Sequence, residues 1–123
     1  FSKMLDLDLG KGKLTMNDCW VNVMGKNCHH AYHLHPLSTI SGTYFLQTPK
    51  GCGSLKFEDP RLPSFMGSPP RKSDAARDNV HFYEISPKAG DLVLFESWLK
   101  HEVTPNQSGQ NRISVSFNYH WAP

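Results

Sequence analysis

Long hydrophobic runs are missing from this sequence. A helix needs roughly 18 or more consecutive apolar residues to cross a bilayer, and no run in the 123-residue chain approaches that length. A strong charge of either sign is missing too, because 13 Lys and Arg residues stand against 11 Asp and Glu residues. Such a balance gives no indication of a nucleic-acid partner. We therefore expect a soluble globular domain without a membrane span.

Cysteine is scarce, and its spacing suggests no pairing. Cys19, Cys28 and Cys52 form neither an even disulfide framework nor a C-x-x-C pair, which favours reduced thiols in the cytoplasm. The chain starts at Phe1 with neither an initiator Met nor a signal-peptide core, so we expect an N-terminal part of the protein to lie upstream. The length of residues 1–123 suits one domain.

Helical patterns are also missing, and strand patterns take their place. Short β-branched and aromatic runs are separated by Gly, Pro and Asn, as in a protein built from strands. In the last run, RISVSFNY, polar and apolar residues alternate, so that Arg112 and Ser114 share one face. We predict about eight strands, among them residues 20–24, 39–47, 54–57, 81–85, 92–95 and 112–119. This pattern indicates a sandwich, barrel or jelly roll.

One stretch fits no strand. Residues 60–79 (PRLPSFMGSPPRKSDAARDN) contain several prolines and basic residues and little hydrophobic periodicity. A loop of about 20 residues in a compact domain is usually a functional lid or a disordered segment. Both interpretations stay open, and residues 60–79 are our candidate lid.

Histidines concentrate in residues 29–36 (HHAYHLHP). If this segment is a strand, His33 and His35 point to the same face and can converge on one ion. Imidazole suits iron, zinc, copper or nickel, and a third ligand would come from elsewhere in the fold. The pair alone does not distinguish a metal site from ordinary surface or core histidines. We expect His29 and His30, beside a polar turn, to be solvated.

A second polar group follows near the C-terminus. Residues 105–109 (PNQSG) indicate a turn, so we predict an antiparallel hairpin that brings Arg112 close to His101. An inward-facing arginine in a β core needs an anion. Its planar guanidinium can donate two parallel hydrogen bonds to a carboxylate, and the Ser114 hydroxyl could donate a third. The alternative is an arginine on a solvated edge strand.

Four motifs occur in a fixed order along the chain. They are H-x-H-P-x-S-x-x-S-G-x-Y-F-L from His33, G-x-L-x-F-x-D-P-R from Gly53, S-W-L-K-H ending at His101, and R-I-S-x-S-F-N from Arg112. Together they resemble a family of 2-oxoglutarate/Fe(II)-dependent oxygenases found in marine microbes and their phages. The resemblance extends over residues 20–118, which is most of the chain.

The resemblance implies an all-β, double-stranded β-helix, which is a jelly-roll or cupin-like barrel that holds Fe(II) and the co-substrate 2-oxoglutarate. His33 and His101 take the positions of the family's two metal-binding histidines. Arg112, with Ser114, takes the position of the family's residues that bind the carboxylate of 2-oxoglutarate farther from the metal. The resemblance also suggests three further co-substrate contacts: Asn22, Ser41 and Tyr44.

The sequence departs from the wider superfamily at His35, which stands where the carboxylate of an H-x-[DE] pair is expected. If His35 binds the metal, the catalytic centre is three imidazoles, those of His33, His35 and His101. Alternatively the carboxylate comes from Glu58 or Asp59, or an exogenous anion fills the position beside a non-ligating His35.

The predicted function is therefore hydroxylation of an unidentified small molecule or side chain, with release of succinate and carbon dioxide. Two alternatives remain open: a cupin-type metal dioxygenase that does not use 2-oxoglutarate, and a non-catalytic barrel that binds a carboxylate ligand. No membrane or nucleic-acid partner is indicated, and an exposed jelly-roll edge would suit a homodimer.

Overall fold

The computed structural model describes residues 1–122 and consists almost entirely of strands. Among these residues, no helix is long and apolar enough to span a membrane. Two short 3-10 helices, η1 (Leu62–Phe65) and η2 (Arg77–Asn79), are the helical elements. The eight strands are β1 (Lys13–Met24), β2 (His30–His33), β3 (Ile40–Gln47), β4 (Leu55–Glu58), β5 (Phe82–Ile85), β6 (Leu92–Glu96), β7 (His101–Val103) and β8 (Arg112–Ala122). The predicted all-β class is confirmed.

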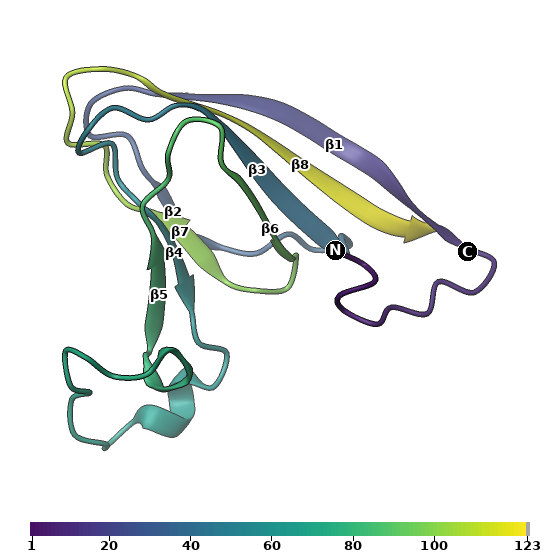
Figure 1. Cartoon of the computed structure of the whole chain (residues 1–123), viewed down its shortest axis with the longest axis horizontal. Helices are drawn as coiled ribbons and strands as arrows, with labels where there is room; N and C mark the ends of the chain where they lie inside the picture. The colour runs from purple at the N-terminus through teal and green to yellow at the C-terminus, as the bar shows by residue number, and fades with distance from the viewer. Residues whose placement is uncertain (123) are drawn as a thin grey trace.

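The strands form two four-stranded antiparallel sheets. Sheet A has the order β1-β8-β3-β6, and sheet B has the order β2-β7-β4-β5. The chain crosses from one sheet to the other at almost every connection, and only β4 and β5 are consecutive within a sheet. Figure 1 shows the long strands β1, β8 and β3 in one layer and the shorter strands of sheet B in the other. This arrangement is a jelly roll, and it confirms the predicted double-stranded β-helix.

The predicted hairpin between the His101 and Arg112 strands is wrong. Strand β7 pairs with β2 and β4 in sheet B, whereas β8 pairs with β1 and β3 in sheet A. The segment between β7 and β8 therefore changes sheets instead of making a tight turn. As a result, His101 and Arg112 belong to opposite walls of the barrel and not to adjacent strands of one ladder.

A buried asparagine stabilises this crossover. The Asn106 amide donates to the carbonyl oxygens of Met24 and Gln110, both at 2.8 Å. Its Oδ1 accepts from the backbone N–H of Ser108 at 2.9 Å, and its own N–H donates to the Cys28 carbonyl at 3.0 Å. Asn106 thus ties the crossover to the end of β1 and fixes the position at which β8 begins.

Residues 60–79 project from the ends of β4 and β5 and contain η1 and η2 (Figure 1). The segment is held at its base by Arg61, which contacts Asp59 at 2.8 Å and donates to the carbonyl of Asp78 at 3.0 Å. The rings of Phe65 and His81 lie 4.4 Å apart. The segment has short-range structure of its own, and its role as a lid stays a prediction.

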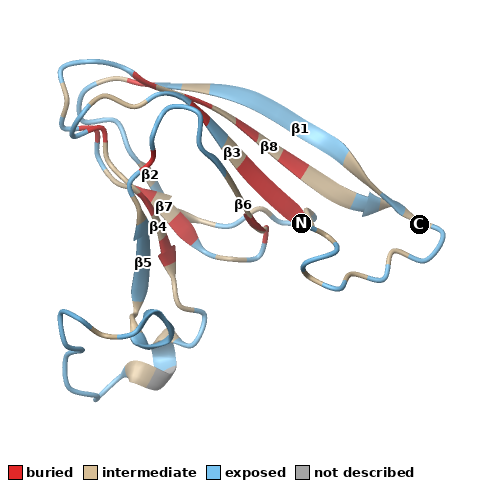
Figure 2. Ribbon diagram, viewed as in Figure 1, coloured by how far each residue is buried: buried red, intermediate tan, exposed pale blue. Residues whose placement is uncertain are grey.

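The apolar core lies between the sheets, where the buried residues of Figure 2 gather. Its members are Met24, Phe45, Leu55, Phe57, Phe95 and Val103. Sheet A contributes three of them, Met24 from β1, Phe45 from β3 and Phe95 from β6, whereas the inward face of β8 is polar. Four alternate residues of β8 are buried there: Arg112, Ser114, Ser116 and Asn118.

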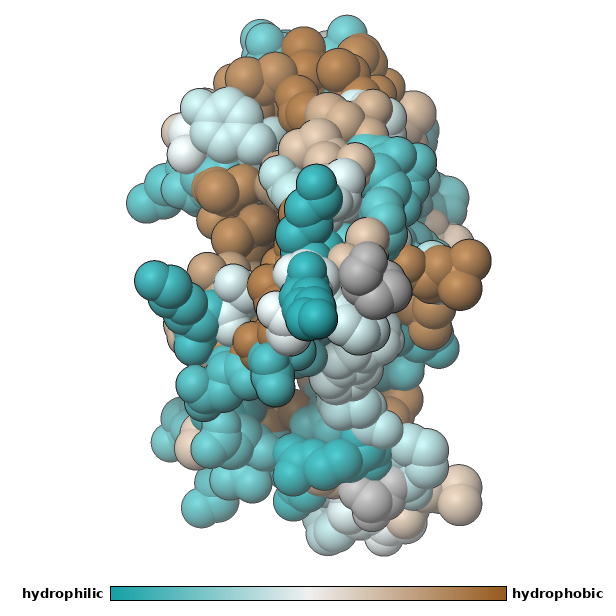
Figure 3. Space-filling view, turned by 90° about the vertical axis from the view of Figure 1, so that its right-hand side faces the viewer, coloured by the Kyte–Doolittle hydropathy of each residue, from teal (hydrophilic) through white to brown (hydrophobic). Residues whose placement is uncertain are grey.

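The outer face of sheet A is correspondingly apolar. One row of neighbouring residues runs across all four strands on this face: Val21, Val115, Tyr44 and Leu92. In Figure 3, apolar side chains gather along the top of the molecule, where Figure 1 shows the long strands of sheet A. The usual alternation of apolar-inside and polar-outside is thus reversed in β8, which indicates that the interior of this sheet serves a polar site.

We expect Asn106→Ala to destabilise the fold by about 2–4 kcal/mol, because it leaves several buried backbone groups without partners. Urea unfolding of the variant measures this loss. Asn79→Ala, in the exposed η2 helix, is the control and should change stability by less than about 0.5 kcal/mol. Equal stability of the two variants would contradict the role of Asn106.

Candidate metal centre

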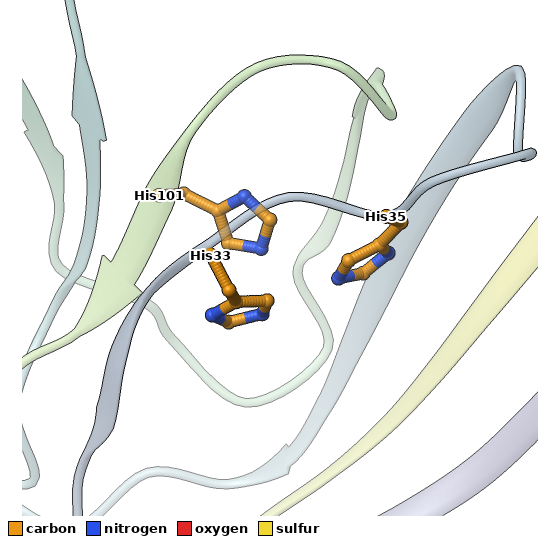
Figure 4. Close-up of side chains that lie close together, drawn as sticks. All are labelled: His33, His35 and His101. Carbon is orange, nitrogen blue, oxygen red and sulfur yellow. The ribbon is translucent and has the colours of Figure 1, made fainter.

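Three histidine side chains meet between the two sheets. One nitrogen from each of His33, His35 and His101 lies within 4.8 Å of the others, and Figure 4 shows the three rings facing a common point. The ring centroids of His33 and His101 are 4.4 Å apart, and that of His35 lies 5.3 Å and 5.1 Å from them. This spacing suits three ligands of one transition-metal ion.

The backbone explains why these rings converge. His33, the last residue of β2, pairs directly with His101, the first residue of β7. His35 lies just beyond the end of β2, where its backbone N–H donates to the carbonyl of Ser97 at 3.0 Å. The predicted convergence of His33 and His35 is therefore present, although a backbone contact to Ser97, and not a continuous strand, holds His35 in place.

Backbone carbonyls fix the tautomers of two of the rings. His33 Nδ1 lies 2.7 Å from the Ala31 carbonyl, and His101 Nδ1 lies 2.8 Å from the Leu99 carbonyl. A carbonyl oxygen only accepts, so each Nδ1 carries the proton and each Nε2 keeps its lone pair. Hydrogen bonds of this kind commonly orient metal-binding histidines.

Burial disfavours the charged form of two of the three rings. His101 is only 3% exposed, and its ring lies 4.7 Å from that of Phe95 and 5.7 Å from that of Phe57. Burial lowers the pKa of His101 to about 4 and also lowers the pKa of His35. Neutral imidazoles are the form that binds a metal, so these two rings are ready to ligate near neutral pH.

Neither acid considered from the sequence joins the histidines. Glu58 forms an ion pair with Lys100 at 3.5 Å, and Asp59 pairs with Arg61. The cavity that contains the three histidines is lined by neither acid. The suggestion that Glu58 or Asp59 supplies a carboxylate ligand is wrong, because both point to partners outside the barrel interior.

Arg112 faces the same cavity from sheet A. It is 2% exposed, and its guanidinium lies 5.2 Å from the centre of the Phe45 ring. In the described part of the chain, the one polar contact of its side chain is a weak one, from Nη1 to the sulfur of Met24 at 3.7 Å, and Nε has no partner. Among the described residues, no acid pairs with it. Burial lowers the pKa of Arg112, but a guanidinium stays charged, so this is a buried cation that needs an anion.

Two other predicted contacts also line this cavity. Ser114 lies two residues from Arg112 on the inward face of β8, and Asn22 faces it from β1. The Asn22 amide donates to Ser116 Oγ at 2.9 Å and accepts from Trp20 Nε1 at 3.1 Å. Asn22 is therefore held in one orientation beside Ser114.

Ser41 and Tyr44 do not line the cavity, contrary to expectation. Ser41 is fully buried, but its hydroxyl contacts the His35 ring at 2.8 Å. Tyr44 is 40% exposed, on the outer face of sheet A. The two residues are three positions apart in β3, so they must lie on opposite faces, and neither reaches the space beside Arg112.

Three further site residues were missed in the sequence. His30, expected in solvent, is half-buried and lines the cavity. Asn118 and Ser97 are buried next to Ser41. Asn118 could have been found, because it continues the alternation of Arg112 and Ser114 along β8. Ser97 carries no such signal.

The centre is enclosed on one side and open on the other. The cavity between the histidines and Arg112 measures about 40 Å³, close to the volume of one or two waters. A wider groove of about 620 Å³ lies between β1 and β2 and is bordered by His33, His35 and Trp20. The two spaces meet at these side chains, so the histidines separate an inner polar cavity from an outer groove.

Comparison with known families identifies the chain. The family model described as "Putative 2OG-Fe(II) oxygenase" matches residues 18–118. The chain belongs to this family. No curated protein matches it.

Solved structures share the fold of this family member. An oxidoreductase of the 2OG-Fe(II) oxygenase family from Burkholderia pseudomallei has a TM-score of 0.68 and 16% identity, covering 90% of this chain and 47% of its own. A prolyl-4-hydroxylase from Pseudomonas putida has a TM-score of 0.61 and 20% identity, covering 97% and 57%. AviO1 from Streptomyces viridochromogenes has a TM-score of 0.64 and 15% identity, covering 97% and 54%. The present chain spans about half the length of these proteins.

We expect the metal-free protein to lose stability as the pH falls from about 6.5 to about 4. In this window the unfolded chain binds a proton at His101, whose ordinary pKa is about 6.5, while the folded protein excludes it because the folded pKa is about 4. The loss should reach up to about 3 kcal/mol and is measured by urea unfolding across this pH range. In His101→Leu the slope should be smaller, and an unchanged slope would assign it to other groups.

Proposed function

We propose that this domain is the catalytic domain of an Fe(II)- and 2-oxoglutarate-dependent oxygenase. The observation that carries the proposal is the position of Arg112. A buried guanidinium with an unpartnered Nε lines the same small cavity as three convergent histidines. A metal site alone explains the histidines and leaves the arginine unexplained, whereas a metal-chelating dicarboxylate explains both.

The three histidines fit the metal of such an enzyme. His33, His35 and His101 would hold Fe(II) through nitrogen, which imidazole does well. Since all three ligands are neutral, the ion would keep its full charge of two. One carboxylate of a dianion such as 2-oxoglutarate would offset one of these two charges, and the other carboxylate would offset the charge of Arg112.

Arg112 and Ser114 fit the far carboxylate of the co-substrate. The guanidinium offers a planar pair of donors, and the Ser114 hydroxyl lies on the same face of β8. The Met24 sulfur is a weak acceptor, so a carboxylate would displace it from Arg112 readily. A cavity of about 40 Å³ is too small for the whole co-substrate, so binding requires side chains around Arg112 to move.

When bound together, Fe(II) and 2-oxoglutarate would react with dioxygen to supply an oxidant that can hydroxylate a substrate, with one oxygen atom going to the product and the other to succinate, and with release of carbon dioxide. The chain's own residues orient these groups and exclude water. The groove between β1 and β2 would admit an unidentified small molecule or side chain to the metal, and residues 60–79 would act as a lid. Three unpaired cysteines and a ferrous site both suit a reducing compartment such as the cytoplasm.

Anaerobic titration tests the whole proposal. We expect one Fe(II) to bind per chain, and subsequent addition of 2-oxoglutarate to produce the weak visible charge-transfer band of the chelate. His101→Ala should abolish both steps, because it removes a ligand. Iron binding without the band would favour a cupin-type dioxygenase. Binding of 2-oxoglutarate without any metal would instead favour a non-catalytic carboxylate-binding barrel.

Arg112→Ala should leave Fe(II) binding in place and weaken 2-oxoglutarate binding by roughly 100-fold, the scale of a lost charge-assisted hydrogen bond of about 1.5–3 kcal/mol. Anaerobic titration of the Fe(II)-loaded variant with 2-oxoglutarate gives the affinity. Arg71→Ala, in the exposed part of residues 60–79, is the matched arginine control and should bind normally. Unchanged affinity in Arg112→Ala would place the carboxylate clamp elsewhere.

A further inference from the structure

Behind His35 lies a network of buried polar side chains for which the proposed oxygenase function gives no role. Ser41 and Ser97 are fully buried, and Asn118 is 7% exposed. Ser41 comes from β3, Ser97 directly follows β6, and Asn118 comes from β8. None of them lines the inner cavity. Asn118 borders the outer groove, and hydrogen bonds with His35 connect the network directly to the metal centre.

The hydrogen bonds of this network are short. His35 Nδ1 lies 2.6 Å from Asn118 Oδ1 and 2.8 Å from Ser41 Oγ. Ser41 Oγ donates to Asn118 Oδ1 at 2.8 Å and also contacts Ser97 Oγ at 2.8 Å. The amide oxygen of Asn118 therefore receives two bonds, one from the hydroxyl and one from the imidazole.

Counting protons gives every bond a direction. A serine hydroxyl has one proton, and Ser41 donates it to Asn118. Ser41 therefore accepts from Ser97, and it presents only lone pairs to His35. Both neighbours of His35 Nδ1 are then acceptors, so Nδ1 carries the proton and Nε2 keeps the lone pair that a metal needs.

We propose that Asn118 is a positioning residue that selects the metal-binding tautomer of His35 and so allows an imidazole to stand where related sites use a carboxylate. This inference rests on the proposed metal site. If the Asn118 amide were turned round, its NH₂ group would donate to Nδ1. The proton of His35 would then move to Nε2, and the ring would present an N–H to the metal in place of a lone pair.

An amide also sets the charge of the centre. Asn118 orients His35 without adding negative charge, so all three ligands stay neutral and the metal retains its attraction for a dianionic co-substrate. A carboxylate at the same position would accept the same two hydrogen bonds but would reduce the net positive charge around the ion. Asn118→Asp therefore separates the orienting role from the charge of the natural site.

Nitrogen-15 NMR of the metal-free protein tests the tautomer without any need for activity. Above neutral pH, we expect the nitrogen-15 chemical shifts of His35 to show a protonated Nδ1 and an unprotonated Nε2. In Asn118→Leu, which has nearly the same volume, the Ser41 hydroxyl loses its acceptor and becomes free to donate to Nδ1. The His35 signals should then shift towards the Nε2–H form. A protonated Nε2 in the natural protein would overturn the proposal.

Fe(II) affinity provides the second readout. Calorimetric titration should show binding weakened roughly 10- to 100-fold in Asn118→Leu, the usual cost of losing a partner of a metal-binding histidine. Asn118→Asp should bind Fe(II) as tightly as the natural protein or more tightly. Asn17→Ala, at an exposed bulge of β1, is the control. Equal Fe(II) affinity in Asn118→Leu and the control would overturn the proposal.

The two proposals fail in different ways. If the NMR spectra show the expected His35 tautomer but Fe(II) does not bind, the metal site is wrong and the hydrogen-bond network stands. If Fe(II) and 2-oxoglutarate bind normally while Asn118→Leu has no effect on tautomer or affinity, the oxygenase function stands and the role of Asn118 is refuted. Asn118→Asp keeps the acceptor, so it provides a folded comparison if Asn118→Leu is unstable.

Discussion

The buried guanidinium of Arg112 is the constraint on which the interior of this barrel depends. A cation at 2% exposure without an acidic partner among the described residues is costly in a protein interior. Its own contacts are with Met24 and Phe45, and polar side chains line the cavity that it faces. The inward face of β8 presents serines and an asparagine, and Asn22 faces them from β1. Strand β8 consequently places its apolar residues outside, and the other three strands of sheet A supply Met24, Phe45 and Phe95 to the apolar core.

The opposite wall of the barrel imposes a different constraint on the histidines. Pairing of β2 with β7 sets His33 against His101, and Phe57 and Phe95 pack around the latter. Burial lowers the pKa of His101, while hydrogen bonds at Nδ1 leave Nε2 available in His33 and His101. Desolvation and hydrogen bonding therefore act together: one removes the competing proton, and the other directs the lone pair.

A metal centre of three imidazoles, as proposed for His33, His35 and His101, would differ in charge from a centre of two histidines and one carboxylate. Without a ligand charge, the metal and Arg112 would together present a strongly positive pair of sites to one dicarboxylate. The crossover between β7 and β8 helps to set the position of Arg112 relative to the histidines. Within it, Asn106 binds the carbonyl of Met24, the last residue of β1, and β8 begins at Arg112. The distance between the arginine and the metal ligands thus depends on a loop residue that touches neither.

Much of this protein follows from its sequence alone. Local residue patterns predicted the starts of the strands at Ile40, Leu55, Leu92 and Arg112 to within one residue, because strand propensity and alternation are local properties. The patterns missed the first seven residues of β1 and the last three of β8. The ordered motifs also indicated the family, with His33, His101 and Arg112 as the central residues of the site. The separation of Ser41 and Tyr44 by three positions already meant that both could not face inward.

Only the tertiary structure decided which strands pair and which face is inside. His101 and Arg112 are separated by a turn-like segment, yet their strands lie in different sheets, since strand pairing depends on contacts distant in the sequence. Alternation shows that β8 has a polar face but not that this face points inward. For the same reason, the contact of Asn118 with His35, across 83 positions of the chain, required the folded barrel.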